Sequence, residues 1–122
     1  MADTGFWIAW GIPARGRETH ALGLLEKSLS GFLEELVRDG RIERYDTAIL
    51  KPQPHELGGF VLLQGSRQQI DTLRRDADFQ SWLNQIQLVA DHVGIADAWV
   101  GDGIAEAVDR YRDALREAGL AE

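Results

Sequence analysis

The first apolar run of the chain is hydrophobic on both of its faces. Residues 6–12 read Phe-Trp-Ile-Ala-Trp-Gly-Ile, and successive side chains of a β-strand point to opposite sides of the sheet. A strand with one face in water alternates apolar and polar side chains, and this run does not alternate. Both sides of the sheet that this strand joins must therefore be covered.

A helical pattern follows the first strand. Between Thr19 and Asp39, apolar residues recur at three- and four-residue steps, which predicts one long amphipathic helix. Thr19 is expected to be its N-cap, and Asp39-Gly40 its end. Gly23 and Gly31 weaken this helix, and such small residues indicate either close packing onto the sheet or a kink.

A second helix is predicted after residue 65. Ser66 and Gln69 have the spacing of a capping box. The residues at 76–78 interrupt the apolar stripe, which resumes at Phe79 and continues to Val89. We therefore expect a short helix, a break and a longer helix.

The remaining apolar segments are short; residues 42–51 alternate like a strand, and 58–65 are built on the apolar run 60–63. Residues 42–51 and 58–65 are predicted strands, joined across the proline-containing turn at 52–56. Residues 93–100 form the fourth predicted strand, and 105–118 a final helix with a narrow apolar stripe. The order is strand, helix, strand, strand, helix, strand and a further helix.

This order predicts an α+β, ferredoxin-like fold in one domain spanning 1–122, with its core at about 6–101. Right-handed crossovers join such halves into a four-stranded antiparallel sheet with both long helices on one face. The other face stays open in a single copy. Because the first strand is apolar on that face as well, we expect a second copy to cover it, forming a homodimer.

The composition of the chain argues against several classes of binding partner. The chain has 122 residues, and 13 basic against 20 acidic residues give a net charge of −7. This balance argues against a nucleic-acid surface or an anionic membrane. No apolar run approaches the roughly 20 residues that span a bilayer, and we expect a cytoplasmic protein. Without cysteine, the chain has no disulfide, thiolate metal site or cysteine nucleophile.

The layout resembles the dimeric α+β barrel superfamily. The resemblance rests on the first strand at 6–12, the helix at 19–39, the hairpin across 52–56 and the interrupted helix around 76–82. Members of that superfamily include cofactor-less monooxygenases, small isomerases and decarboxylases, and proteins resembling haem-degrading enzymes. One branch carries a His-Asp pairing that begins on the first strand, and here that strand has no ionisable residue.

Asp97 is the sharpest candidate for chemistry. It lies in the middle of the fourth predicted strand beside Trp99, while Ala96 and Ala98 occupy the other face. Small residues suit the face beneath helices, so Asp97 and Trp99 are expected on the open side, with Trp10 as a second aromatic wall. A carboxylate there could serve as an acid or base. The alternatives are a solvated strand end or an ion pair with an arginine across the dimer.

Other polar residues could join such a site. His20 is a candidate second catalytic group, or alternatively a surface histidine of the first helical turn. Tyr45 could donate a hydrogen bond to a bound carbonyl, or belong to an edge strand protected by Arg44 and Asp46. Gln64 could line the same pocket.

These residues favour a small-molecule-binding protein, with or without cofactor-independent proton transfer or oxygenation of a planar, largely apolar compound. The alternative is a non-catalytic interaction or regulatory module whose barrel is filled by side chains. A metal or haem protein is a third interpretation, but the three histidines lack metal-ligand spacing. We therefore expect no metal and no cofactor. The presence of a cavity separates the first two interpretations.

Overall fold

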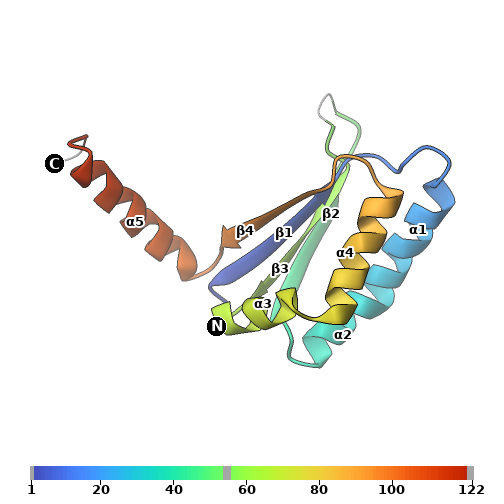
Figure 1. Cartoon of the computed structure of the whole chain (residues 1–122), viewed down its shortest axis with the longest axis horizontal. Helices are drawn as coiled ribbons and strands as arrows, with labels where there is room; N and C mark the ends of the chain where they lie inside the picture. Colours follow the sequence, from blue (N-terminus) through green and yellow to red (C-terminus); the bar gives the residue numbers. More distant parts are fainter. Residues whose placement is uncertain (1, 54–55, 121–122) are drawn as a thin grey trace.

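Four strands form one antiparallel sheet in the computed structural model, which describes residues 2–53 and 56–120. The strands lie in the order β2-β3-β1-β4, so β2 and β4 are the edges (Figure 1). They comprise β1 (Thr4–Trp10), β2 (Arg44–Ile49), β3 (Gly59–Gly65) and β4 (Gly94–Trp99). The predicted ferredoxin-like topology is confirmed.

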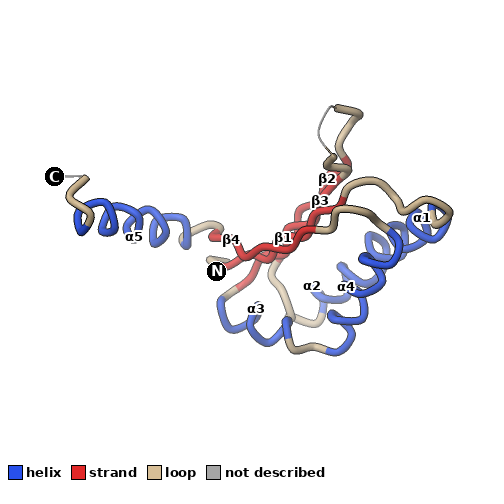
Figure 2. Tube along the Cα trace, turned by 45° about the horizontal axis from the view of Figure 1, so that its top comes forward, coloured by secondary structure: helices blue, strands red, loops and turns tan. Residues whose placement is uncertain are grey.

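Helices cover one face of this sheet, and the last helix extends away from it (Figures 1 and 2). The first helical segment is continuous and contains a π-helical turn, η1. The helical elements are α1 (Glu18–Lys27), η1 (Ser28–Phe32), α2 (Leu33–Arg38), α3 (Arg67–Arg74), α4 (Ala77–Val89) and α5 (Gly103–Glu117).

The start of α1 and the role of its small residues differ from the prediction. The helix begins at Glu18 after Arg17, which makes no side-chain cap hydrogen bond, so Thr19 is not the N-cap. A Cβ added at Gly23 or Gly31 would meet no described atom within 4 Å, so neither glycine permits close packing. The irregularity is instead the π-helical turn, where Ser28 Oγ donates a hydrogen bond to the Leu24 carbonyl.

The helix boundaries after β3 follow their local signals. Ser66 and Gln69 form the complete capping box at the start of α3. Asp76 then caps α4, because its Oδ1 accepts a hydrogen bond from the Phe79 amide at 3.0 Å. The predicted break and resumption are confirmed.

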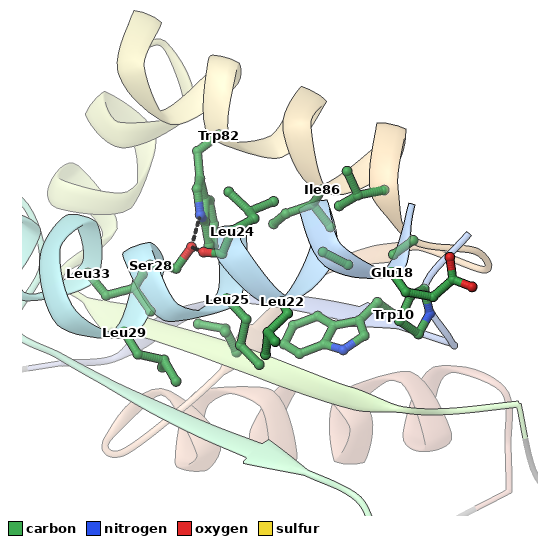
Figure 3. Close-up of a pocket in the computed structure, with 15 residues that line it drawn as sticks. Trp10, Glu18, Leu22, Leu24, Leu25, Ser28, Leu29, Leu33, Trp82 and Ile86 are labelled. Atoms are coloured by element: carbon green, nitrogen blue, oxygen red, sulfur yellow. Dashed lines mark hydrogen bonds between the residues drawn. The ribbon is translucent and has the colours of Figure 1, made fainter. Parts of the chain in front are cut away.

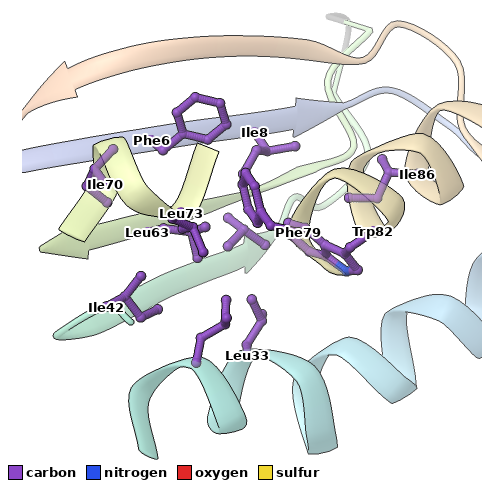
Figure 4. Close-up of a cluster of buried hydrophobic side chains, with 12 residues drawn as sticks. Phe6, Ile8, Leu33, Ile42, Leu63, Ile70, Leu73, Phe79, Trp82 and Ile86 are labelled. Carbon is purple, nitrogen blue, oxygen red and sulfur yellow. The ribbon is translucent and has the colours of Figure 1, made fainter. Parts of the chain in front are cut away.

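The main core lies between the sheet and its helices (Figure 4). Phe6 and Ile8 of β1 point to this side, and the Phe6 ring meets the Phe79 ring edge-on at 5.6 Å between centroids. Aliphatic side chains from β3, α2, α3 and α4 complete the cluster, including Val61, Leu63, Leu33, Leu36, Ile70, Leu73 and Ile86.

The opposite face of the sheet is apolar and has no described helix over it (Figure 2). Trp7 and Ala9 of β1 point to this side and pair with Leu62 and Phe60 of β3. The rings of Trp7 and Phe60 lie 6.4 Å apart. We call this surface the open face. It is the uncovered face that the doubly apolar first strand predicts.

Candidate functional site

A cavity of about 190 Å³ lies between α1, α4 and the helix-covered side of the sheet. Its wall is almost entirely apolar (Figure 3). The lining residues come from β1, β3, the loop after β1 and four helical segments, and include Trp10, Pro13, Ala21, Leu22, Leu25, Leu29, Leu33, Val61, Trp82 and Ile86.

The cavity runs from an exposed mouth to the hydrophobic core. Leu22 at the mouth exposes 57% of its surface, and the neighbouring Glu18 is also exposed. At the inner end, Leu33 and Trp82 are buried and belong to the core cluster. The inner end is therefore dry, whereas the mouth is open to solvent.

The packing of α1 reflects this hollow. Of its ten described residues, none is buried, although Leu24 and Leu25 face inward and line the cavity. The α4 helix, on the other side of the cavity, buries Phe79, Trp82 and Ile86. The α1 helix thus forms a roof held over the cavity and not a helix packed directly onto the sheet.

Polar groups at the cavity are few and mostly satisfied. Ser28 Oγ accepts a hydrogen bond from Trp82 Nε1 at 2.8 Å and donates one to the Leu24 carbonyl at 2.7 Å. Both partners of the Ser28 hydroxyl therefore belong to the protein, which leaves it poorly placed to act as a nucleophile. Among the described lining residues, Glu18 is the ionisable one. Such a wall offers a bound molecule mainly shape complementarity and apolar contact.

Trp10 is the predicted ligand-binding residue that the structure places in this cavity. Its strand, β1, ends there, and the indole ring forms part of the wall near the mouth (Figure 3). His20, in contrast, is exposed on α1 and does not line the cavity.

The orientation predicted for Asp97 is wrong. Asp97 pairs across the sheet with Phe6, so it points to the side of the helices and not to the open face. There it forms an ion pair with Arg74 of α3, whose guanidinium also lies 5.2 Å from the centre of the Phe6 ring. The open-face positions of β4 are occupied by Ala96 and Ala98, so the small residues of this strand lie on the uncovered face and not beneath the helices.

Trp99 and Tyr45 also lie away from the cavity. Trp99 pairs with Thr4 on the same side as Asp97 and leaves 55% of its surface exposed. The Tyr45 hydroxyl donates a hydrogen bond to Glu34 of α2, and this bond raises the pKa of the phenol. Tyr45 therefore tethers the edge strand β2 to α2.

Gln64 points to the open face and is buried there. Its Nε2 donates a hydrogen bond to Asp46 Oδ2 at 2.6 Å, and Arg44 binds the same carboxylate. Hydrogen bonds from Arg44 and Gln64 lower the pKa of the Asp46 carboxyl. These three side chains form a polar border on the open face, far from the helix-side cavity.

Within 2–53 and 56–120, no three His, Cys, Asp or Glu side chains gather into a metal-binding group. His55 lies outside the described residues. In the part of the chain that the structure describes, no helix is both long and apolar enough to cross a membrane.

The cavity itself was missed by the sequence interpretation. Leu22, Leu25 and Leu29 had the spacing of an ordinary core-facing stripe, and that spacing does not distinguish a packed helix from a roof. The available signal was the pair of weak helix formers, Gly23 and Ser28, within the same stripe.

Comparisons with known proteins place the fold. No family model matches the chain, and no curated protein does. A dimeric ferredoxin-like protein of unknown function from Bacteroides fragilis is 6% identical with a TM-score of 0.56, covering 80% of this chain and 96% of its own. An ethyl tert-butyl ether D family protein from Bacillus halodurans is 7% identical with a TM-score of 0.56, covering 80% and 97%.

A third similar structure is that of an enzyme. A mutant of SnoaB, a cofactor-independent oxygenase from Streptomyces nogalater, is 6% identical with a TM-score of 0.54, covering 81% of this chain and 91% of its own. The chain shares the ferredoxin-like fold of these structures, which is the fold that the order of its elements predicted. At these identities the likeness establishes the fold alone.

Proposed function

We propose that the chain is a homodimeric protein that binds a small, largely apolar organic compound in the cavity beneath α1. The observation that carries the proposal is the cavity of about 190 Å³ with an apolar wall and an open mouth. Apolar cavities of about 150 Å³ stay dry and bind benzene. A cavity of this size therefore suits a ligand of one aromatic ring or a compact bicycle.

The wall favours a planar ligand. The Trp10 indole lies near the mouth and the Trp82 indole at the inner end, and aromatic rings pack well against flat apolar surfaces. Because the Nε1 of Trp82 is already bonded to Ser28, the inner end offers no free donor to a polar ligand. The polar part of a bound compound would lie at the mouth, beside Glu18.

Proton transfer or oxygenation of such a compound is the second candidate function. It is favoured by the fold shared with a cofactor-independent oxygenase and by one carboxylate, Glu18, at the cavity mouth. Asp97 and His20 do not line the cavity, and their catalytic roles remain predictions. The cavity lies on the helix-covered side of the sheet and not on the open face, so the filled-barrel alternative is not tested by it and stays a prediction.

The dimer is supported by the surface area of one copy. A compact monomer of this mass is expected to expose roughly 6,600 Å², whereas the chain exposes 8099 Å². The chain therefore exposes about 1,500 Å² more than a compact fold of its mass, and the extended α5 helix contributes to that excess. The apolar open face is the part of the sheet that a second copy would cover.

Titration with naphthalene and toluene, followed by backbone amide NMR, tests the binding site. The expected result is shifts confined to the residues around the cavity, at 10–13, 18–33, 61 and 82–90. Ala21→Phe places a ring in the cavity and should weaken naphthalene binding at least tenfold. His20→Phe adds the same ring on the exposed side of α1 and should leave binding unchanged. Absence of saturable shifts, or equal binding by both variants, would overturn the proposal.

A further inference from the structure

The α5 helix leaves the body of the protein at the end of β4 (Figures 1 and 2). It meets the rest of the chain near its first turn, where Gly103 is buried and Glu106 lies 3.5 Å from the Arg67 guanidinium. Beyond that turn, Val108 and Tyr111 leave 49% and 69% of their surfaces exposed. Most of α5 is therefore a helix without a described partner in its own chain.

The direction of α5 is set by the backbone. The Val100 amide donates to the Asp3 carbonyl, and the Gly103 amide donates to the Val100 carbonyl at 2.8 Å. A Cβ at Gly103 would lie 2.0 Å from the Asp3 carbonyl oxygen, so another residue there would displace the helix. Gly101 has a φ of 51°, which favours glycine. This close fit aims α5 away from its own sheet.

The sequence of α5 divides it into an apolar and a charged side. Four apolar residues recur at helical spacing and form what we call the α5 stripe: Ile104, Val108, Tyr111 and Leu115. A helix of 15 residues is marginal in water without a packing partner. The stripe therefore requires a surface to cover it.

The charge of α5 indicates which kind of surface could cover the stripe. The polar side of α5 pairs with itself, through Glu106–Arg110 at 2.8 Å and similar contacts one or two turns further on. The helix carries four acidic and three basic residues. A nearly neutral helix in a chain of net charge −7 is poorly suited to nucleic acid or an anionic membrane. An apolar protein surface fits the stripe.

We infer that the α5 stripe packs against a second copy of this chain, and that the partner's α5 packs reciprocally against the first. The inference rests on the proposed dimer and adds to it a second contact, made by α5, which we call the α5 arm. The stripe begins directly after β4, whose Ala96 and Ala98 lie on the open face, so it follows that face along the chain. The extended α5 helix contributes to the area of about 1,500 Å² that the chain exposes beyond a compact monomer of its mass, and packing on a second copy would bury part of that excess.

Paired variants of the full chain test this arm. Val108→Gln/Tyr111→Gln removes two apolar side chains from the stripe and introduces a good helix former. Arg110→Gln/Asp113→Gln makes the same number of changes on the charged side without altering the net charge. Sedimentation over a concentration series should show a dimer for the wild type and the charged-side variant. The stripe variant should have a dimer dissociation constant at least tenfold higher.

Amide hydrogen exchange supplies a second measurement. In the dimer, amides from Val108 to Arg116 should be protected, and dilution below the dissociation constant should remove that protection. A wild-type dimer whose dissociation constant is unchanged by the stripe variant would overturn the arm but leave the dimer standing. A wild-type monomer would overturn both, while naphthalene binding would still test the cavity. Protection of α5 in a monomer would show that it packs on its own chain.

Discussion

The indole Nε1 of Trp82 donates a buried hydrogen bond of 2.8 Å to Ser28 Oγ, joining α4 to the π-helical turn across the inner end of the cavity. Ser28 and Trp82 are 5% exposed, so neither group can exchange its partner for bulk water. This bond connects the roof of the cavity to the best-packed helix of the core.

Removing Ser28 should therefore be costly. Ser28→Ala leaves the Trp82 indole N–H buried without an acceptor, which should lower the free energy of unfolding by about 1–3 kcal/mol. Trp82→Phe removes the donor and some volume. In a denaturant-unfolding cycle, the double variant should lose less stability than the two single variants together. Strict additivity would show that the bond contributes nothing to stability.

Gly23→Ala should stabilise the protein. The added Cβ meets no described atom within 4 Å, and alanine restricts the unfolded chain and favours the helix by about 0.5–1 kcal/mol. Gly40→Ala is the matched control. Because Gly40 has a φ of 72°, the same change at this position should destabilise the protein. Urea unfolding measures both, and a loss of stability in Gly23→Ala would mean that the helix is packed more closely than described.

Asp97→Asn should leave naphthalene binding unchanged. Asp97 is paired with Arg74 at the edge of the sheet, outside the cavity, and 62% of its side chain is exposed. Exposed ion pairs contribute about 0–1 kcal/mol, so the loss of unfolding free energy should be small. NMR titration and urea unfolding of one variant check both expectations. A variant that folds normally but binds naphthalene tenfold more weakly would restore Asp97 as a site residue.

Acid should weaken the junction between α3 and α4. The hydrogen bond from the Phe79 amide, together with the Arg41 guanidinium, holds the pKa of the Asp76 carboxyl below its usual range. A lowered folded-state pKa contributes stability above the unfolded value of about 3.9, and this is lost as the pH falls through the folded pKa.

Asp76→Asn isolates that contribution. Asparagine caps a helix about as well as aspartate, so the variant should lose the charge but keep the cap. We expect lower stability at pH 7 by up to about 1 kcal/mol and a shallower fall of stability below about pH 4. Unfolding by urea between pH 2 and 7 measures both slopes. Parallel curves would contradict the assigned role of the Asp76 charge.

The elements that sequence analysis predicted correctly depend on neighbouring residues. The capping box of Ser66 and Gln69 and the helix end at Gly40 are set by local hydrogen bonds and local backbone conformation. The topology followed because the helical stripes and the short apolar segments were separated by recognisable turns and caps. Thr19 failed as an N-cap because the chain enters the helix at Glu18 without any side-chain cap.

The site depended on relationships between distant elements. Alternation placed Asp97 and Trp99 on one face of β4, but which face the helices cover was decided by where α3 and α4 cross the sheet. In the same way, Leu22 and Leu25 were predicted to be core residues. The hydrophobic stripe of a helix that packs on other side chains has the same sequence pattern as the stripe of a helix that lines a cavity. The spacing of apolar residues along an element predicts which of its sides faces the neighbouring elements, but it does not predict how far away those elements lie.

β1 connects the two ends of the sheet that carry these features. Thr4, at one end, lies beside Trp99 and the start of α5, whereas Trp10, at the other, borders the cavity mouth. Seven residues of strand separate them by about 20 Å. In the proposed dimer a compound would therefore enter and leave each subunit without dissociation of the dimer, and its residence time should not depend on protein concentration.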